Sequence, residues 1–115
     1  MSSAPRPAPR ISTDQERAQW AWKAVQRQLP KGYVELVKSV PTMVMGSGLI
    51  QTIAFLAEKG KDHHKLLLDQ LCDRKQPTQW ISELVEMKPQ EYRAATEEAL
   101  ACLRWLRHFA AVVNR

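Results

Sequence analysis

The chain has 115 residues, of which 44% are hydrophobic and 25% charged, and it carries a formal net charge of +5. That length suits one domain with a single core, and no apolar run reaches the ~18 residues that cross a bilayer. The first ten residues lack the apolar stretch of a secretory signal, so we expect a cytoplasmic protein without membrane contact. Cys72 and Cys102 stand in apolar helical patterns and are expected to be buried free thiols.

Residues 1–12 combine three prolines and two arginines with small polar residues, which is typical of a flexible tail. We therefore divide the chain into a disordered tail at 1–12 and a helical bundle domain at 13–115. Thr13 and Glu16 have the spacing of a capping box, in which the threonine hydroxyl accepts from the backbone N–H of the glutamate. Apolar residues then recur at helical intervals, so the first helix is expected to span 13–29.

The middle of the chain predicts three further helices. Residues 33–45 form a helix that is kinked at Pro41, because proline removes one backbone hydrogen bond. The glycines at 46 and 48 predict a break, and residues 49–59 then form a helix that is apolar on most of its circumference. That helix is expected to lie centrally in the bundle. Another helix is predicted over 62–74, with leucines on its inward side.

The last third of the chain predicts two helices. A short one follows Pro77, and a long one spans 89–113 with Pro89 at its first position, where proline is favoured. Apolar and small residues of the long helix alternate by four and three residues, which forms a seam for neighbouring helices. No segment alternates with period two between turn residues. The predicted fold is therefore all-α, a compact single-domain bundle of about five to six helices.

Side chains that could bind a metal are His63, His64 and Cys72. Structural zinc requires four nitrogen or sulfur ligands in close pairs, and the sequence offers no second pair. Adjacent histidines also point about 100° apart on a helix, so we interpret His63 and His64 as surface residues. The sequence contains neither a phosphate-binding glycine loop nor a nucleophile with its base. We expect no metal, no cofactor and no catalytic activity.

The chain has four tryptophans, a high number for its length. Trp20 and Trp22 lie two positions apart on the first predicted helix, so their side chains face different ways. One of them is therefore expected to be partly exposed. Exposed tryptophan is enriched at protein interfaces, which makes Trp20 and Trp22 candidates for contact with a protein partner.

Basic residues gather in two rows. Each row could bind phosphates by displacing counterions, or could be an ordinary solvated face. No aromatic-rich RNA-binding motif stands beside either row, so any nucleic-acid contact is expected to involve the backbone and not the base sequence. The first row runs off the first helix and contains Lys23, Arg27, Lys31 and Lys38; the second, near the C-terminus, contains Arg104, Arg107, His108 and Arg115.

Two blocks of sequence resemble a known family. The first, YVELVKSVPTMVMGSGLIQTIAFLAEKG at residues 33–60, has a tyrosine, Val-Pro, Gly-Leu and Ala-Phe-Leu in this order. The second, EYRAATEEALACLRWLRHFA at residues 91–110, contains Tyr-Arg, Thr-x-Glu-Ala-Leu and Trp-Leu-Arg. Both resemble the small helical subunit of type III-B CRISPR effector complexes, the Cmr small subunit, and the likeness extends over residues 13–110. Ser47 before the central helix and Lys88 before the last one depart from that family's pattern.

The resemblance implies a non-catalytic, all-helical subunit that stacks in several copies beside the backbone subunits of the complex. Its partners would be the backbone and large subunits, copies of itself, and the guide RNA and target RNA, in antiviral defence. Two alternatives stay open: a helical adaptor that binds only proteins, through its tryptophans, and a small metalloenzyme that uses the two histidines and Cys72. Basic residues at matching positions, which would contact RNA or a neighbouring subunit, are Lys38, Arg93, Arg104 and Arg107.

Overall fold

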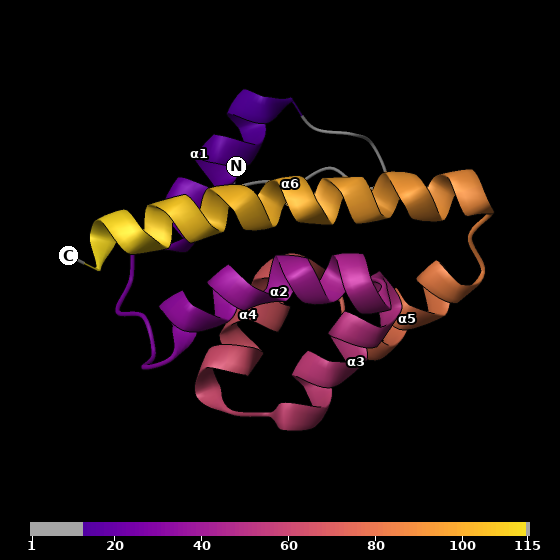
Figure 1. Ribbon diagram of the computed structural model, residues 1–115, viewed down its shortest axis with the longest axis horizontal. Coiled ribbons are helices and arrows are strands. Elements are labelled where there is room, and N and C mark those ends of the chain that lie inside the picture. The colour runs from indigo at the N-terminus through magenta and orange to yellow at the C-terminus, as the bar shows by residue number, and fades with distance from the viewer. Residues whose placement is uncertain (1–12, 115) are drawn as a thin grey trace.

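A computed structural model describes residues 13–114, which fold into six α-helices (Figure 1). The predicted all-α, single-domain bundle is confirmed, and no strand occurs in this part of the chain. The predicted tail at 1–12 and the candidate Arg115 lie outside the described residues. The helices are α1 (Asp14–Ala24), α2 (Tyr33–Ser47), α3 (Leu49–Lys59), α4 (Asp62–Cys72), α5 (Pro77–Val85) and α6 (Pro89–Val113).

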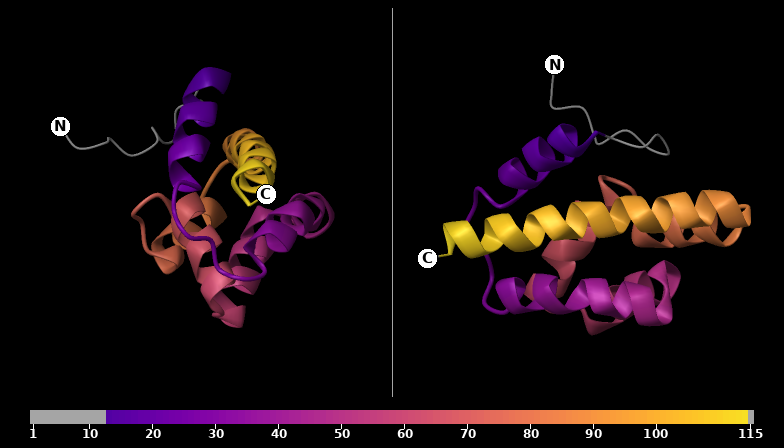
Figure 2. Two further views of the ribbon diagram at one scale, coloured as in Figure 1. Left: turned by 90° about the vertical axis from the view of Figure 1, so that its left-hand side faces the viewer. Right: turned by 45° about the horizontal axis from the view of Figure 1, so that its top comes forward.

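Helix α6 runs the length of the molecule and is the axis of the bundle. Its 25 residues rise about 37 Å at 1.5 Å per residue, close to the molecule's longest extent of 41 Å. Helix α1 packs on one side of α6, and α2 packs antiparallel to α6 on another side (Figures 1 and 2). Helices α3, α4 and α5 form a further layer beyond α2. Two faces of α6 are thus buried, and a third is left to solvent.

Helix α3 is not central, so that prediction is wrong. It packs mainly against α2, α4 and α5, and the side chains of Gln51, Ala54 and Ala57 are exposed on its outer face. Exposing a small apolar residue such as alanine to water costs little free energy. Apolar residues around the whole helix therefore did not mean that the helix is buried on all sides. Its buried face consists of Leu49, Thr52, Ile53 and Leu56.

Helix α1 begins as predicted but ends five residues early. Thr13 Oγ1 accepts from the backbone N–H of Glu16 at 3.1 Å, and the Thr13 N–H donates to Glu16 Oε1 at 2.8 Å, so the capping box is confirmed. The helix stops at Ala24, whose carbonyl accepts a hydrogen bond from the side-chain amide of Gln70 at 3.1 Å. Because α4 satisfies that carbonyl, the chain can leave the helix there without an unpaired acceptor.

Helix α2 continues through Pro41 and Gly46, so the predicted break over three residues is confined to Gly48. Gly48 has φ +93° and ψ 160°, a backbone conformation that is essentially restricted to glycine. The hydroxyl of Tyr92 lies 3.4 Å from where a Cβ on Gly48 would stand, and it accepts a hydrogen bond from the Ile50 N–H at 3.2 Å. Gly48 therefore turns the chain sharply enough for α3 to begin beside the start of α6.

Two glycine variants should change stability in opposite directions. Gly48→Ala should lower the free energy of unfolding by about 1 to 2 kcal/mol, because alanine rarely adopts this backbone conformation. Gly46→Ala should raise it by about 0.5 to 1 kcal/mol, since Gly46 lies inside α2 with nothing within 4 Å of an added Cβ. Urea unfolding of both variants measures the difference, and equal effects would contradict the special role of Gly48.

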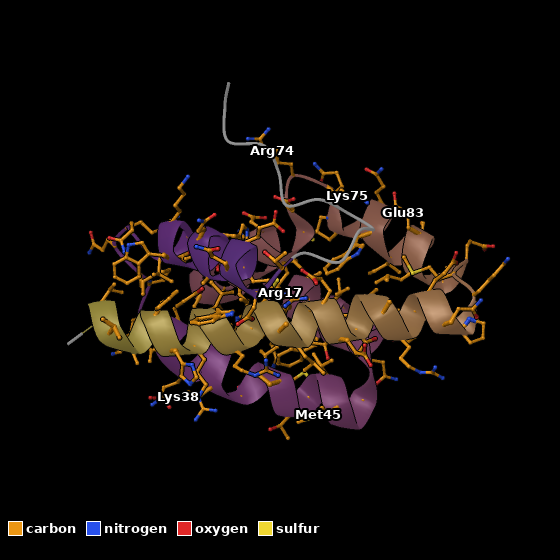
Figure 3. All side chains as sticks on the ribbon, turned by 90° about the horizontal axis from the view of Figure 1, so that it is seen from above. Arg17, Lys38, Met45, Arg74, Lys75 and Glu83 are labelled. Carbon is orange, nitrogen blue, oxygen red and sulfur yellow. The ribbon has the colours of Figure 1, made fainter. Side chains whose placement is uncertain are left out.

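Helix α4 ends at Cys72, two residues before its predicted end. The next two residues, Asp73 and Arg74, have φ values of +51° and +78°, so neither continues a right-handed helix. The reversal leads the chain toward α5. Just before that helix, the Lys75 side chain forms an ion pair with Glu83 of α5 (Figure 3). A left-handed turn made by two non-glycine residues has no strong signal in the sequence, which explains the error.

Candidate nucleic-acid interface

The solvent face of α6 carries most of the predicted C-terminal basic row. Arg104, Arg107 and His108 are all exposed on this helix, whereas their neighbours Leu103 and Leu106 are fully buried. Helical spacing places the three basic side chains on the side left free by α1 and α2. No Asp or Glu occurs between residues 99 and 114. This part of α6 is therefore a cationic strip without carboxylates of its own.

Lys38 of α2 extends this strip across the helix pair. The Ile50–Tyr92 hydrogen bond fixes the end of α2 beside the start of α6, and the two helices run antiparallel. Because both helices advance about 1.5 Å per residue, Lys38 stands at about the level of Arg104. It lies with Met45 along the outer edge of α2 (Figure 3). An exposed pair with Glu35 at 3.6 Å neutralises part of its charge, although such pairs are weak.

Arg93 stands apart from the other candidates on α6. It precedes Arg104 by eleven positions, which corresponds to about 17 Å along the helix. Glu97, one turn further along, is exposed on the same side of the helix. The structure therefore does not bring Arg93 into the cationic strip.

The first predicted basic row does not lie on one helix. Lys23 is in α1, but Arg27 and Lys31 belong to the connection of residues 25–32, because α1 ends at Ala24. All three side chains are exposed. The connection passes the C-terminal end of α6 (Figures 1 and 2), so these residues and the α6 strip lie at the same end of the molecule. These basic residues therefore do not form a row along one helix. They lie at one end of the molecule, which we call the cationic end.

The two tryptophans of α1 face different ways, as predicted. Trp20 is half-buried and packs against the core, whereas the side chain of Trp22 is 43% exposed. Trp22 makes a T-shaped contact with Phe109 of α6, with ring centroids 5.0 Å apart. Phe109 also contacts Trp105, at 5.2 Å. Sequence reasoning missed Phe109, although its position four residues after Trp105 placed both rings on one helical face.

Polar contacts hold α1 on α6. Arg17 of α1 donates from Nε and from Nη2 to Glu98 Oε1, at 3.2 and 3.0 Å, between the two helices (Figure 3). The hydrogen bond to Glu98 raises the pKa of Arg17. One turn of α6 away, Cys102 Sγ donates to the other carboxylate oxygen of Glu98. Trp105 Nε1 donates to Asp14 at 2.9 Å. Neither cross-helix pair was predicted, because sequence spacing carries no signal for them.

His64 is buried, so the prediction of two surface histidines is wrong for it. Its ring lies 4.2 Å from the ring of His63 and 5.8 Å from that of Phe55, between centroids. Its Nδ1 atom is buried without a hydrogen-bond partner. Burial, and then the positive charges of His63, Lys59 and Lys61, lower the pKa of His64. His64 therefore favours the neutral state, because burial disfavours the charged form of the ring.

The folded protein should become less stable as the pH falls from 7.5 to 5.5. Because the pKa of His64 lies below its ordinary value of 6.5 in the folded state, the unfolded state takes up the proton first. The stabilisation by neutral His64 is complete above pH 6.5 and decreases below it. His64→Phe keeps a ring against Phe55 and should flatten this slope in thermal melts. An unchanged slope in the variant would contradict the assignment.

Within residues 13–114, no three His, Cys, Asp or Glu side chains gather closely enough to hold a metal ion. Both cysteines are buried, and no disulfide joins them. None of the helices in this range combines the length and apolar character needed to cross a membrane.

The fold and the cationic strip together define a small all-helical protein with a basic outer face. In its overall fold the chain is similar to a CRISPR-associated Cmr5 family protein from Thermus thermophilus, whose crystal structure matches with a TM-score of 0.70 at 24% identity. That match covers 89% of this chain and 93% of the other. At this level of sequence identity, the structural similarity establishes the fold alone.

Sequence comparison identifies the family. The model of the CRISPR-associated Cmr5 proteins matches residues 13–113. A protein described as CRISPR system Cmr subunit Cmr5, also from Thermus thermophilus, is 31% identical over 79% of this chain and 89% of its own length. The chain therefore belongs to the Cmr5 family, and the family resemblance of residues 33–60 and 91–110 is confirmed.

Proposed function

We propose that the chain is a non-catalytic subunit of a type III-B CRISPR effector complex and contacts the backbone of guide and target RNA. The observation that carries this proposal is the strip formed by Arg104, Arg107 and His108 on the solvent face of α6. Exposed basic side chains on a stretch of helix that has no carboxylate of its own attract phosphate and release its counterions. Such contacts position a strand and do not read its sequence, which suits an assembly whose specificity comes from base pairing. The protein would act in the cytoplasm.

We also propose that several copies stack beside the backbone subunits. Support comes from exposed apolar residues at opposite ends of the long axis: Val85 at the end of α5 is 57% exposed, and Val112 near the end of α6 is 51% exposed. Different patches at the two ends suit a head-to-tail contact, which repeats without closing into a dimer. A small charge on each copy is sufficient, because several copies along one strand bind multivalently.

Native isolation of the tagged protein tests this proposal. The expected result is co-purification of backbone and large subunits together with a guide RNA. The isolated chain should bind RNA weakly, with an affinity that falls steeply as salt rises. Recovery of protein partners without RNA, and RNA binding that ignores salt, would instead support the helical adaptor.

A further inference from the structure

The cationic end of the molecule contains an exposed aromatic ring. Contacts with the phosphate backbone of RNA would not involve this ring. Trp22 is 43% exposed although it has a firm neighbour in Phe109, at 5.0 Å and with an interplanar angle of 76°. In a T-shaped contact, one ring presents its edge and the other its face. In either arrangement, at least one face of the Trp22 indole is not covered by Phe109.

The ring is also held in place before any partner arrives. Phe109 is itself packed against Trp105, whose indole N–H is bonded to Asp14. Trp22, Phe109 and Trp105 thus form a chain of contacts across α1 and α6. A rigid aromatic side chain loses little conformational entropy on binding, so a planar partner could stack on it at low cost.

The charge around Trp22 indicates what kind of partner fits. Residues 17–34 contain no Asp or Glu, and neither do residues 99–114, so the two stretches that meet at this contact are free of acid. The carboxylates that border them are engaged: Glu16 accepts from Thr13, Glu35 pairs with Lys38, and Glu98 binds Arg17. The exposed basic side chains of the first stretch, which contains Trp22, are Lys23, Arg27 and Lys31. Those of α6 are Arg104, Arg107 and His108, which lie at the same end of the molecule but on another face of the helix than Phe109.

We propose that Trp22 is a stacking platform for an unpaired nucleobase of single-stranded RNA. An exposed aromatic ring at a basic end of a protein is an arrangement that suits single strands, because phosphates meet the charges while a base covers the ring. The same end of a second copy carries the same positive charge and would be repelled. This inference rests on the proposed RNA contact and deepens it, since it adds a base contact to backbone binding.

The test compares two RNA strands of equal length, an oligoadenylate and an abasic ribose-phosphate strand. The wild-type chain should bind the oligoadenylate about 5- to 100-fold more tightly, which is roughly the range that one stacked base contributes. Trp22→Leu should remove the advantage and leave abasic binding unchanged. Trp22→Phe should keep part of it, and Met45→Ala, a control at another exposed apolar residue, should keep all of it.

Each other outcome has a definite meaning. Equal affinity of the wild type for both strands overturns stacking and leaves backbone binding intact. Failure of both strands to bind at low salt overturns stacking together with the proposed RNA contact. If the Trp22→Leu variant no longer co-purifies with a protein subunit but keeps its RNA affinity, the ring belongs to a protein interface. Base-dependent quenching of wild-type tryptophan fluorescence is expected, and its absence would count against stacking whether or not the variants fold.

Discussion

Reversing two charges on α6, Arg104→Glu with Arg107→Glu, should weaken binding to single-stranded RNA by roughly 10- to 100-fold at about 50 mM salt. Both guanidinium groups are on the solvent face of α6, so their loss should not disturb the core. Each phosphate contact adds about 0.7 to the slope of log affinity against log salt on a single strand. Removing two should lower that slope by about 1.4, which fluorescence anisotropy at several salt concentrations measures.

A matched double variant separates position from net charge. Lys59→Glu with Lys65→Glu changes the net charge equally, but these exposed lysines belong to α3 and α4, away from the outer face of α6. This control should lose only the small, non-local part of the affinity. Equal losses in the two double variants would mean that the strip on α6 is not the RNA-binding surface.

Replacing Glu98 by alanine should lower the free energy of unfolding by about 3 kcal/mol. The side chains of Arg17 and Glu98 are only 15% and 13% exposed, so the variant leaves a largely buried guanidinium with only the exposed carboxylate of Asp14, at 3.6 Å. Only Ala21 of α1 is fully buried, so this pair adds to a modest apolar contact between α1 and the rest of the bundle. We expect the thermal midpoint to fall by roughly 10 °C.

A double-mutant cycle tests the explanation. Arg17→Met with Glu98→Leu replaces both partners by apolar groups and should recover most of the lost stability, because no unpaired charge remains. If the double variant is as unstable as the sum of the single variants, the two side chains do not stabilise the helix pair through each other.

The sequence predicted the helices where local signals are strong. The Thr13 capping box and the proline at the start of α6 each mark a helix start within one residue. Predictions from the sequence failed where contacts with distant residues, and not local signals, determine the structure. Ala24 ends α1 because Gln70, 46 positions away in the sequence, takes its carbonyl. The burial of His64 likewise depends on Phe55, which no helical spacing within α4 could indicate.

The candidate interface was partly visible in the sequence. Arg104, Arg107 and His108 share one face of a single helix, so helical spacing was sufficient to group them. Trp22 was predicted to be one of two rings of which one is exposed. Its neighbour Phe109 could not be found in the same way, because the contact joins helices whose packing depends on the whole chain.

By itself the sequence determined the all-α class, the family and the positive charge of the second half of the C-terminal helix, since all three depend on residue type and on spacing within one helix. The tertiary structure decided which face of α6 meets solvent, where α1 ends, and that Trp22 lies at the cationic end of the molecule. The physical reason is the range of the interactions. Helical periodicity and capping act over about four residues, whereas the Arg17–Glu98 pair joins side chains 81 positions apart.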